Sequence, residues 1–188
     1  AMLAPALQNV REAALQVTCA SNQRQCLFAF ALYAEDHGDF YPHRYQPDLP
    51  AGSRMWSDVL ANAGLLSHEE QERLACPANT AATSSSCRSK YAYHTLMYEH
   101  PATGSMTPHR RCSIRKPSEM PALADATPWF EGGKNRIYFY AEAPNAGYQL
   151  LGYEWHNGVN VVFADGHGQT GISFENFNPD WVDPDFHF

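Results

Sequence analysis

Apolar residues recur with helical spacing through the first 35 residues, and neither Pro nor Gly interrupts the chain between Pro5 and Gly38. Residues 6–35 are rich in Ala, Leu, Gln, Arg and Glu, which favour helix. One face carries apolar side chains at steps of four, seven, four and three: Leu15, Cys19, Cys26, Phe30 and Tyr33. The pattern predicts one helix of about 45 Å, whose second half packs on a domain.

The start of this helix has a different pattern. Ala1 to Leu7 are apolar almost all round, which does not suit a helix end in water. The stretch is either a frayed terminus or the tail of a longer apolar segment that precedes Ala1. A compact domain of this size has a radius of gyration of about 16 Å, so we expect part of the helix to protrude.

The rest of the chain predicts a loop-rich head of short elements. A polar turn at residues 36–42 ends the long helix, and short helices are expected at 53–63, capped by Ser53, and at 67–74, where Ser67 and Glu70 form a capping box. Strands are expected from Tyr91 and at 123–124, 136–140, 149–155, 159–164 and 167–172. An Asp165-Gly166 pair joins the last two strands, which predicts a type I′ hairpin turn.

These elements predict an α+β fold, with a long N-terminal α-helix packed on a small antiparallel β-sheet with long loops. Residues 1–35 form the helix and residues 36–188 the globular α+β head. The net charge of -7 argues against a nucleic-acid partner, because phosphate binding needs a basic face. A helix that spans a bilayer needs roughly 18 to 20 consecutive apolar residues, and no stretch of this sequence reaches that length.

Five cysteines without a CxxC pair favour disulfides in an oxidising compartment, and hence export. Cys19 with Cys76 is the first predicted pair, because both flank the region where the long helix meets the head. Cys87 with Cys112 is the second pair. Cys26 lies seven residues from Cys19 on the same face and is an alternative partner for Cys76.

Chemistry-bearing residues are sparse. GxSxG is absent, and no constellation marks a catalytic cysteine, so we expect neither an enzyme nor a cofactor. His156, Asp165 and His167 are the one cluster that resembles a transition-metal site. The structural alternative is that Asp165 and Gly166 form the turn, His167 is a solvated strand residue and His156 caps a preceding loop. Calcium at the tail is a further alternative, with these oxygen ligands: Asp180, Asp183 and Asp185.

Three segments occur together in a characteristic order. The first runs from Cys19-Ala20-Ser21-Asn22-Gln23-Arg24-Gln25 to the turn 36–42, the second is Cys76-Pro77 followed by Tyr91-Ala92-Tyr93, and the third is residues 156–167. Together they resemble pilin-like proteins with a prepilin-type cleavage and methylation segment and a C-terminal H-X9-DG signature, which are related to type II secretion pseudopilins. The residues of this sequence that correspond to the H-X9-DG signature are His156, Asp165 and Gly166. Eight residues separate His156 from Asp165, where the family has nine.

The resemblance implies a non-enzymatic subunit of a type II secretion or type IV pilus-like filament in the cell envelope. An apolar helix before Ala1 would anchor the subunit in the inner membrane, with the head in the periplasm or outside the cell. The processing motif itself does not occur in this sequence. We expect the contacts with other pilin-like subunits along one stripe of the protruding helix: Ala6, Val10, Ala14 and Val17.

An alternative function rests on the aromatic content of the head. An envelope-anchored head would then recognise a glycan or a secreted protein through aromatic loops that contain Trp129, Phe130, Tyr138, Tyr140, Trp155 and Trp181. Glycan binding that is lost on changing exposed Trp residues would favour this alternative.

Overall fold

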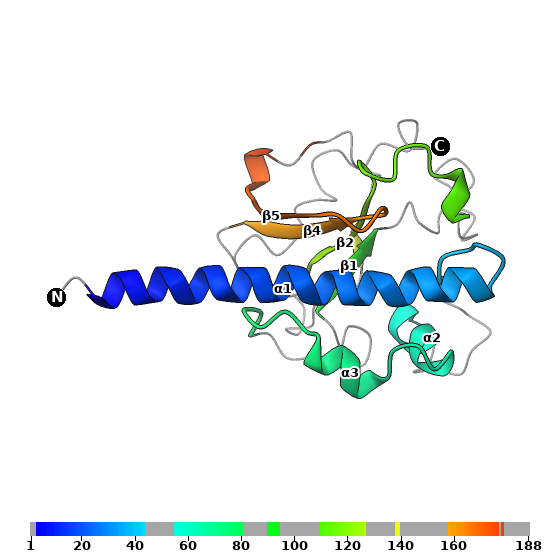
Figure 1. Ribbon diagram of the computed structural model, residues 1–188, viewed down its shortest axis with the longest axis horizontal. Coiled ribbons are helices and arrows are strands. Elements are labelled where there is room, and N and C mark those ends of the chain that lie inside the picture. Colours follow the sequence, from blue (N-terminus) through cyan, green and yellow to red (C-terminus); the bar gives the residue numbers. More distant parts are fainter. Residues whose placement is uncertain are drawn as a thin grey trace.

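One long helix, α1 (Leu3–Asp36), lies between the two parts of the head in the computed structural model of this protein (Figure 1). The structure describes residues 3–43, 55–80, 90–94, 110–126, 138–139, 158–176 and 178. A β-sheet lies on one side of α1, and two short helices, α2 (Trp56–Asn62) and α3 (His68–Arg73), lie on the other. The α+β fold with a long N-terminal helix, a small sheet and long loops is confirmed.

The end of α1 follows from its sequence. Gly38 has φ +66° and Asp39 has φ +69°, a left-handed conformation that glycine adopts without steric cost. The Asp39 amide donates to the Ala34 carbonyl at 2.8 Å, so one of the last helical carbonyls has a partner. The polar turn therefore ends the helix where the sequence predicts.

Within the described residues the sheet has five strands, in the order β3-β1-β2-β4-β5. Their bounds are Tyr91–His94 for β1, Pro121–Asp125 for β2, Tyr138–Phe139 for β3, Val159–Phe163 for β4 and Gly168–Ile172 for β5. The four strands β1, β2, β4 and β5 pair antiparallel, as predicted, whereas the two-residue β3 pairs parallel with β1 at the edge. Every residue of β2 and β4 is buried. The strand expected at 149–155 lies outside the described residues.

Two local details differ from the sequence prediction. Helix α2 begins at Trp56, after Met55 rather than Ser53, because the Asp58 carboxylate accepts the Met55 amide at 3.3 Å. The hairpin between β4 and β5 has positive φ at Gly166 alone, so the predicted type I′ turn is wrong. The Asp165 carboxylate accepts its bond from the His167 amide at 3.0 Å, and the Gly166 amide donates to Phe163; these bonds fit a type I turn followed by a left-handed glycine.

The capping box of α3 is confirmed, because Ser67 and Glu70 bond to each other's backbone amides. Packing between α1, α2 and the sheet centres on Phe30. Its ring centroid lies 5.1 Å from that of Trp56 in α2 and 4.9 Å from that of Tyr93 in β1. The second half of α1 thus belongs to the core of the head, as the apolar face predicts.

Candidate functional site

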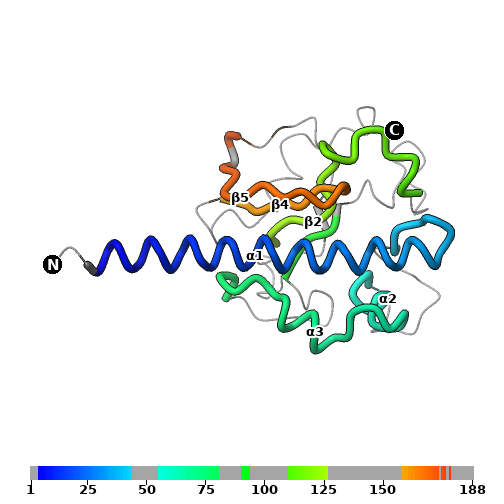
Figure 2. The backbone as a smooth tube through the Cα atoms, viewed as in Figure 1, coloured from blue at the N-terminus to red at the C-terminus, as the bar shows by residue number. Residues whose placement is uncertain are grey.

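Helix α1 changes its surroundings at Cys19. Residues 4–14 are exposed, whereas Cys19, Cys26 and Phe30 are fully buried. Figure 2 shows the first third of α1 extending beyond the sheet and the short helices. We call the part of α1 before the first buried residue, Leu3 to Thr18, the stem. No described helix combines the length and the apolar content needed to cross a membrane.

The stem carries apolar side chains on the side of α1 that faces away from the sheet. Leu7, Val10, Val17 and, further along, Phe28 are all 65–68% exposed. With the exposed Ala14 they form the outer stripe: Leu7, Val10, Ala14, Val17 and Phe28. At about 100° per residue, the stripe lies opposite the face that holds Cys19 and Phe30.

The spacing of the outer stripe suits contact with another helix. Leu7, Val10, Ala14 and Val17 follow at steps of three, four and three, the spacing of a helix–helix seam. The predicted contact residues Ala6, Val10, Ala14 and Val17 are all exposed, and their contact with other subunits stays a prediction. The predicted contact stripe did not include Leu7 or Phe28. Leu7 could have been found from the sequence, because it lies seven residues before Ala14 and so on the same face of the helix.

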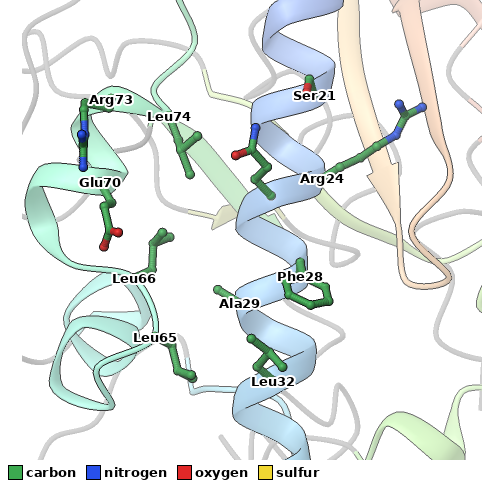
Figure 3. A pocket seen from close by; sticks show the side chains of 11 residues that line it. Ser21, Arg24, Phe28, Ala29, Leu32, Leu65, Leu66, Glu70, Arg73 and Leu74 are labelled. Atoms are coloured by element: carbon green, nitrogen blue, oxygen red, sulfur yellow. The ribbon is translucent and has the colours of Figure 1, made fainter.

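A groove of about 650 Å³ lies between α1 and α3, beside the end of the outer stripe. In Figure 3, Ala29 and Leu32 on α1 lie opposite Leu65 and Leu66 across it, and Phe28 also lines it. Glu70 and Arg73 on α3 add charged groups at the side of α3. Of the outer stripe, Phe28 alone lines the groove, beside the polar Ser21, Arg24 and Gln25 of α1. The lining residues form no catalytic set of groups.

The structure places two of the three predicted metal ligands in the β4–β5 turn. His167 Nδ1 lies 2.7 Å from the Asp165 carboxylate, and its ring stacks on Phe163 at 4.3 Å between centroids. Both side chains therefore stabilise the turn itself. His156 lies outside the described residues, so the metal site and the H-X9-DG relation stay predictions.

Other predicted residues also lie outside the described part of the chain. These are the calcium candidates Asp180, Asp183 and Asp185, the cysteine Cys87, and the aromatic residues Trp129, Phe130, Tyr140, Trp155 and Trp181. Only the backbone of Tyr138 is described. Cys112 is exposed and carries a thiol, as do the buried Cys19, Cys26 and Cys76.

A buried polar cluster joins α1 to the sheet where the stem meets the head. The Asp125 carboxylate, at the end of β2, accepts hydrogen bonds from Gln23 Nε2 at 3.0 Å, the Asn160 amide at 2.9 Å and the Cys19 thiol at 2.9 Å. Gln23 Nε2 also donates to the Asn160 carbonyl at 3.1 Å. Asp125 and Asn160 are fully buried and Gln23 is 1% exposed. We call Gln23, Asp125 and Asn160 the clasp.

The clasp borders a group of possible metal-ligating atoms. Sulfur atoms of Cys19 and Cys76 and a carboxylate oxygen of Asp125 lie within 4.8 Å of one another, the one such group among the residues that the structure describes. Burial, then the hydrogen bond with Cys76 and the charge of Asp125, raises the pKa of the Cys19 thiol. A thiol held neutral in this way is a poor nucleophile, so the geometry does not support thiol catalysis.

Sequence reasoning did not identify the clasp. Its members lie 102 and 137 positions apart along the chain from Gln23, so local patterns do not connect them. The available signal was a polar residue, Gln23, one turn after Cys19 on the apolar face of α1.

The arrangement of a long N-terminal helix against an antiparallel sheet is consistent with a pilin-like fold. No protein-family model, curated protein sequence or solved structure matches the chain.

Proposed function

We propose that the chain is a non-enzymatic, pilin-like subunit of an envelope filament of the type II secretion or type IV pilus kind. The observation that carries the proposal is the outer stripe, an apolar surface on the stem that its own head leaves exposed. The three sequence segments that resemble pilin-like proteins, and a fold of the same kind, support it. The partners are other pilin-like subunits, which pack against the stem.

The energetics of the outer stripe give only weak association between two free subunits. Burying an apolar side chain of this size contributes about 1.5–3 kcal/mol relative to full exposure. Leu7, Val10, Val17 and Phe28 are about two-thirds exposed, so they offer roughly 4–8 kcal/mol together. Bringing two free proteins together costs about as much, so the stripe alone gives weak pairing.

A membrane anchor changes that balance. In the proposal, an apolar segment before Ala1 inserts in the inner membrane and holds the stems at a common height and orientation. Part of the entropy cost of association is then met before the stems touch. The head, in the periplasm or outside the cell, decorates the filament and takes no part in chemistry.

The test is made in the native cell with the full-length protein. Val10→Glu and Val17→Glu, combined, place two charges on the outer stripe, and burying an unpaired charge in an apolar contact is strongly unfavourable. We expect filament assembly, measured by sedimentation of sheared fractions and by cross-linking between stems, to fall at least tenfold. Both positions are exposed, so the thermal unfolding of the head should not change.

Gln8→Glu is the matched control. Gln8 is exposed on the same turn as Val10 but lies about 200° around the helix axis from it. It adds one negative charge, where the double variant adds two, and does so without touching the stripe, so assembly should remain. Assembly that is equally good in the double variant and in the control would refute the stem as the assembly surface.

A further inference from the structure

Two buried cysteines meet where the stem enters the head. Cys19 lies on α1 and is fully buried, and Cys76 follows α3 and is 2% exposed. Both are thiols in the structure, with sulfur atoms within 4.8 Å of each other. A disulfide requires about 2.05 Å between the two sulfurs. Side-chain rotation therefore has to bring the sulfurs closer by at most about 3 Å.

Contacts that do not involve sulfur already hold the Cys76 segment on α1. Asn22 Nδ2 donates to the Ala75 carbonyl at 3.4 Å. The Tyr91 hydroxyl from β1 lies 2.9 Å from the Leu74 carbonyl and 3.4 Å from the Cys19 carbonyl. The backbone on both sides of the cysteine pair is therefore fixed by the fold, and the proximity of the sulfurs is built in.

We propose that Cys19 and Cys76 are joined by a disulfide that forms before the head closes over them. The bond links the stem helix directly to the segment after α3. Cys19 is chosen because its sulfur lies within 4.8 Å of the Cys76 sulfur, and Cys26, the other thiol on the inner face of α1, is the competitor that the test has to exclude. Cys112 is exposed at the far turn and does not take part.

The covalent step is thiol–disulfide exchange with an oxidant that itself carries a disulfide. The thiolate of one cysteine attacks that disulfide, which forms a mixed disulfide and releases one oxidant sulfur. The second cysteine then attacks the sulfur of the first, so the Cys19–Cys76 bond forms and the other oxidant sulfur leaves. Two electrons and two protons pass from the cysteines to the oxidant, whose two sulfurs both end as thiols.

The order of events follows from burial. Exchange needs a thiolate and access for the oxidant, and neither is available once the head has closed. Both sulfurs are then covered, and the Asp125 carboxylate beside Cys19 disfavours a second negative charge. Oxidation therefore occurs during folding, and once folded the protein keeps its cysteine pair either as thiols or as a disulfide.

The test uses the full chain refolded from the reduced, denatured state with glutathione disulfide as the oxidant. We expect peptide mapping without reduction to recover Cys19 linked to Cys76, two hydrogens lighter than the thiol pair. Cys26→Ala, the matched buried control, should keep the link, and Cys76→Ala should leave Cys19 open to alkylation after denaturation. Protein folded in its reduced form should acquire the link at least tenfold more slowly in the same buffer.

Three results would overturn the proposal. One is that Cys19 and Cys76 are both alkylated after denaturation of the oxidatively refolded protein. Another is that either residue is linked to a different cysteine. The third is one zinc ion per chain with both thiols intact, which would make the group with Asp125 a metal site instead. Equal rates for folded and unfolded protein would overturn the order of events.

Discussion

In protein whose Cys19 is kept reduced, replacing Asp125 by alanine should loosen the junction between the stem helix and the sheet. The carboxylate accepts hydrogen bonds from Gln23 on α1, from the backbone amide of Asn160 on β4 and from the Cys19 thiol. Its removal leaves the Asn160 amide buried with no acceptor at this position. Gln23 keeps its bond to the Asn160 carbonyl at 3.1 Å, so the amide side chain is only partly affected.

The expected loss of stability follows from these bonds. A buried amide left without its acceptor costs about 1–3 kcal/mol, and the bonds from Gln23 and Cys19 add about 1 kcal/mol each. The variant also avoids the cost of burying a carboxylate, which offsets part of the loss. We expect the free energy of unfolding to fall by about 3 kcal/mol, and Tm to fall by roughly 6–12 °C for a chain of this length.

The assay is urea denaturation followed by circular dichroism, with Asp58→Ala as the matched control. Asp58 is 2% exposed and bonds His68 Nε2 at 2.9 Å, but the His68 side chain is 41% exposed. That partner reaches water when the carboxylate is removed, but the Met55 amide at the start of α2 also loses its 3.3 Å bond, so the control should lose about 1–2 kcal/mol. If Asp125→Ala costs no more than Asp58→Ala, the clasp does not fasten α1 to the sheet.

Further outcomes concern the hairpin, the α1 end and the cysteine pair. Gly158→Ala should lower the free energy of unfolding by more than about 3 kcal/mol, because the added Cβ would lie 2.5 Å from a backbone carbon on β5. The control Gly64→Ala has open space around the added Cβ and should cost about 1–2 kcal/mol for its positive φ. Equal urea midpoints for the two variants would contradict the hairpin packing. The Cys112 backbone amide, with the Arg111 guanidinium, lowers the pKa of Asp39; a lowered pKa adds stability above about pH 4 that is lost as the pH falls further. Between pH 5 and pH 3, wild type should therefore lose more stability than Asp39→Asn, a substitution chosen because asparagine also tolerates φ > 0. Equal losses of stability in the two proteins would contradict this. Reducing the Cys19–Cys76 link should lower the free energy of unfolding by about 4 kcal/mol on the chain-entropy account, and an unchanged urea midpoint after reduction would contradict that value.

Local signals in the sequence were sufficient for α1, for α3 and for most of the sheet. The long stretch free of Pro and Gly and the inner face with Phe30 fix a helix without reference to the rest of the chain. Ser67 and Glu70 do the same for α3, because a capping box lies within four residues. The outer stripe was predicted in part for the same reason, since helical spacing is visible in one segment.

Features that depend on distant segments were not predictable in this way. Asp125 ends an apolar strand, and nothing near it in the sequence shows that Gln23 will donate to it. The hairpin turn depended on a side-chain bond from Asp165 to the His167 amide, which competes with the turn that an Asp-Gly pair usually forms. The parallel edge strand β3 likewise depends on a partner chosen by the fold.

The positions of the clasp and the cysteine pair fit the assembly role proposed for the stem. In a filament, force on a subunit enters its head where α1 leaves it, and that point lies between Thr18 and Gln23. Apolar contacts such as those of Phe30 lie further inside and would be loaded only after this point gives way. Directional hydrogen bonds from Gln23, and a covalent link at Cys19, resist shear along the helix better than apolar packing alone, because apolar contacts have no preferred direction. With α1 fastened to the sheet at the turn where force first enters the head, stem and head would move as one rigid body.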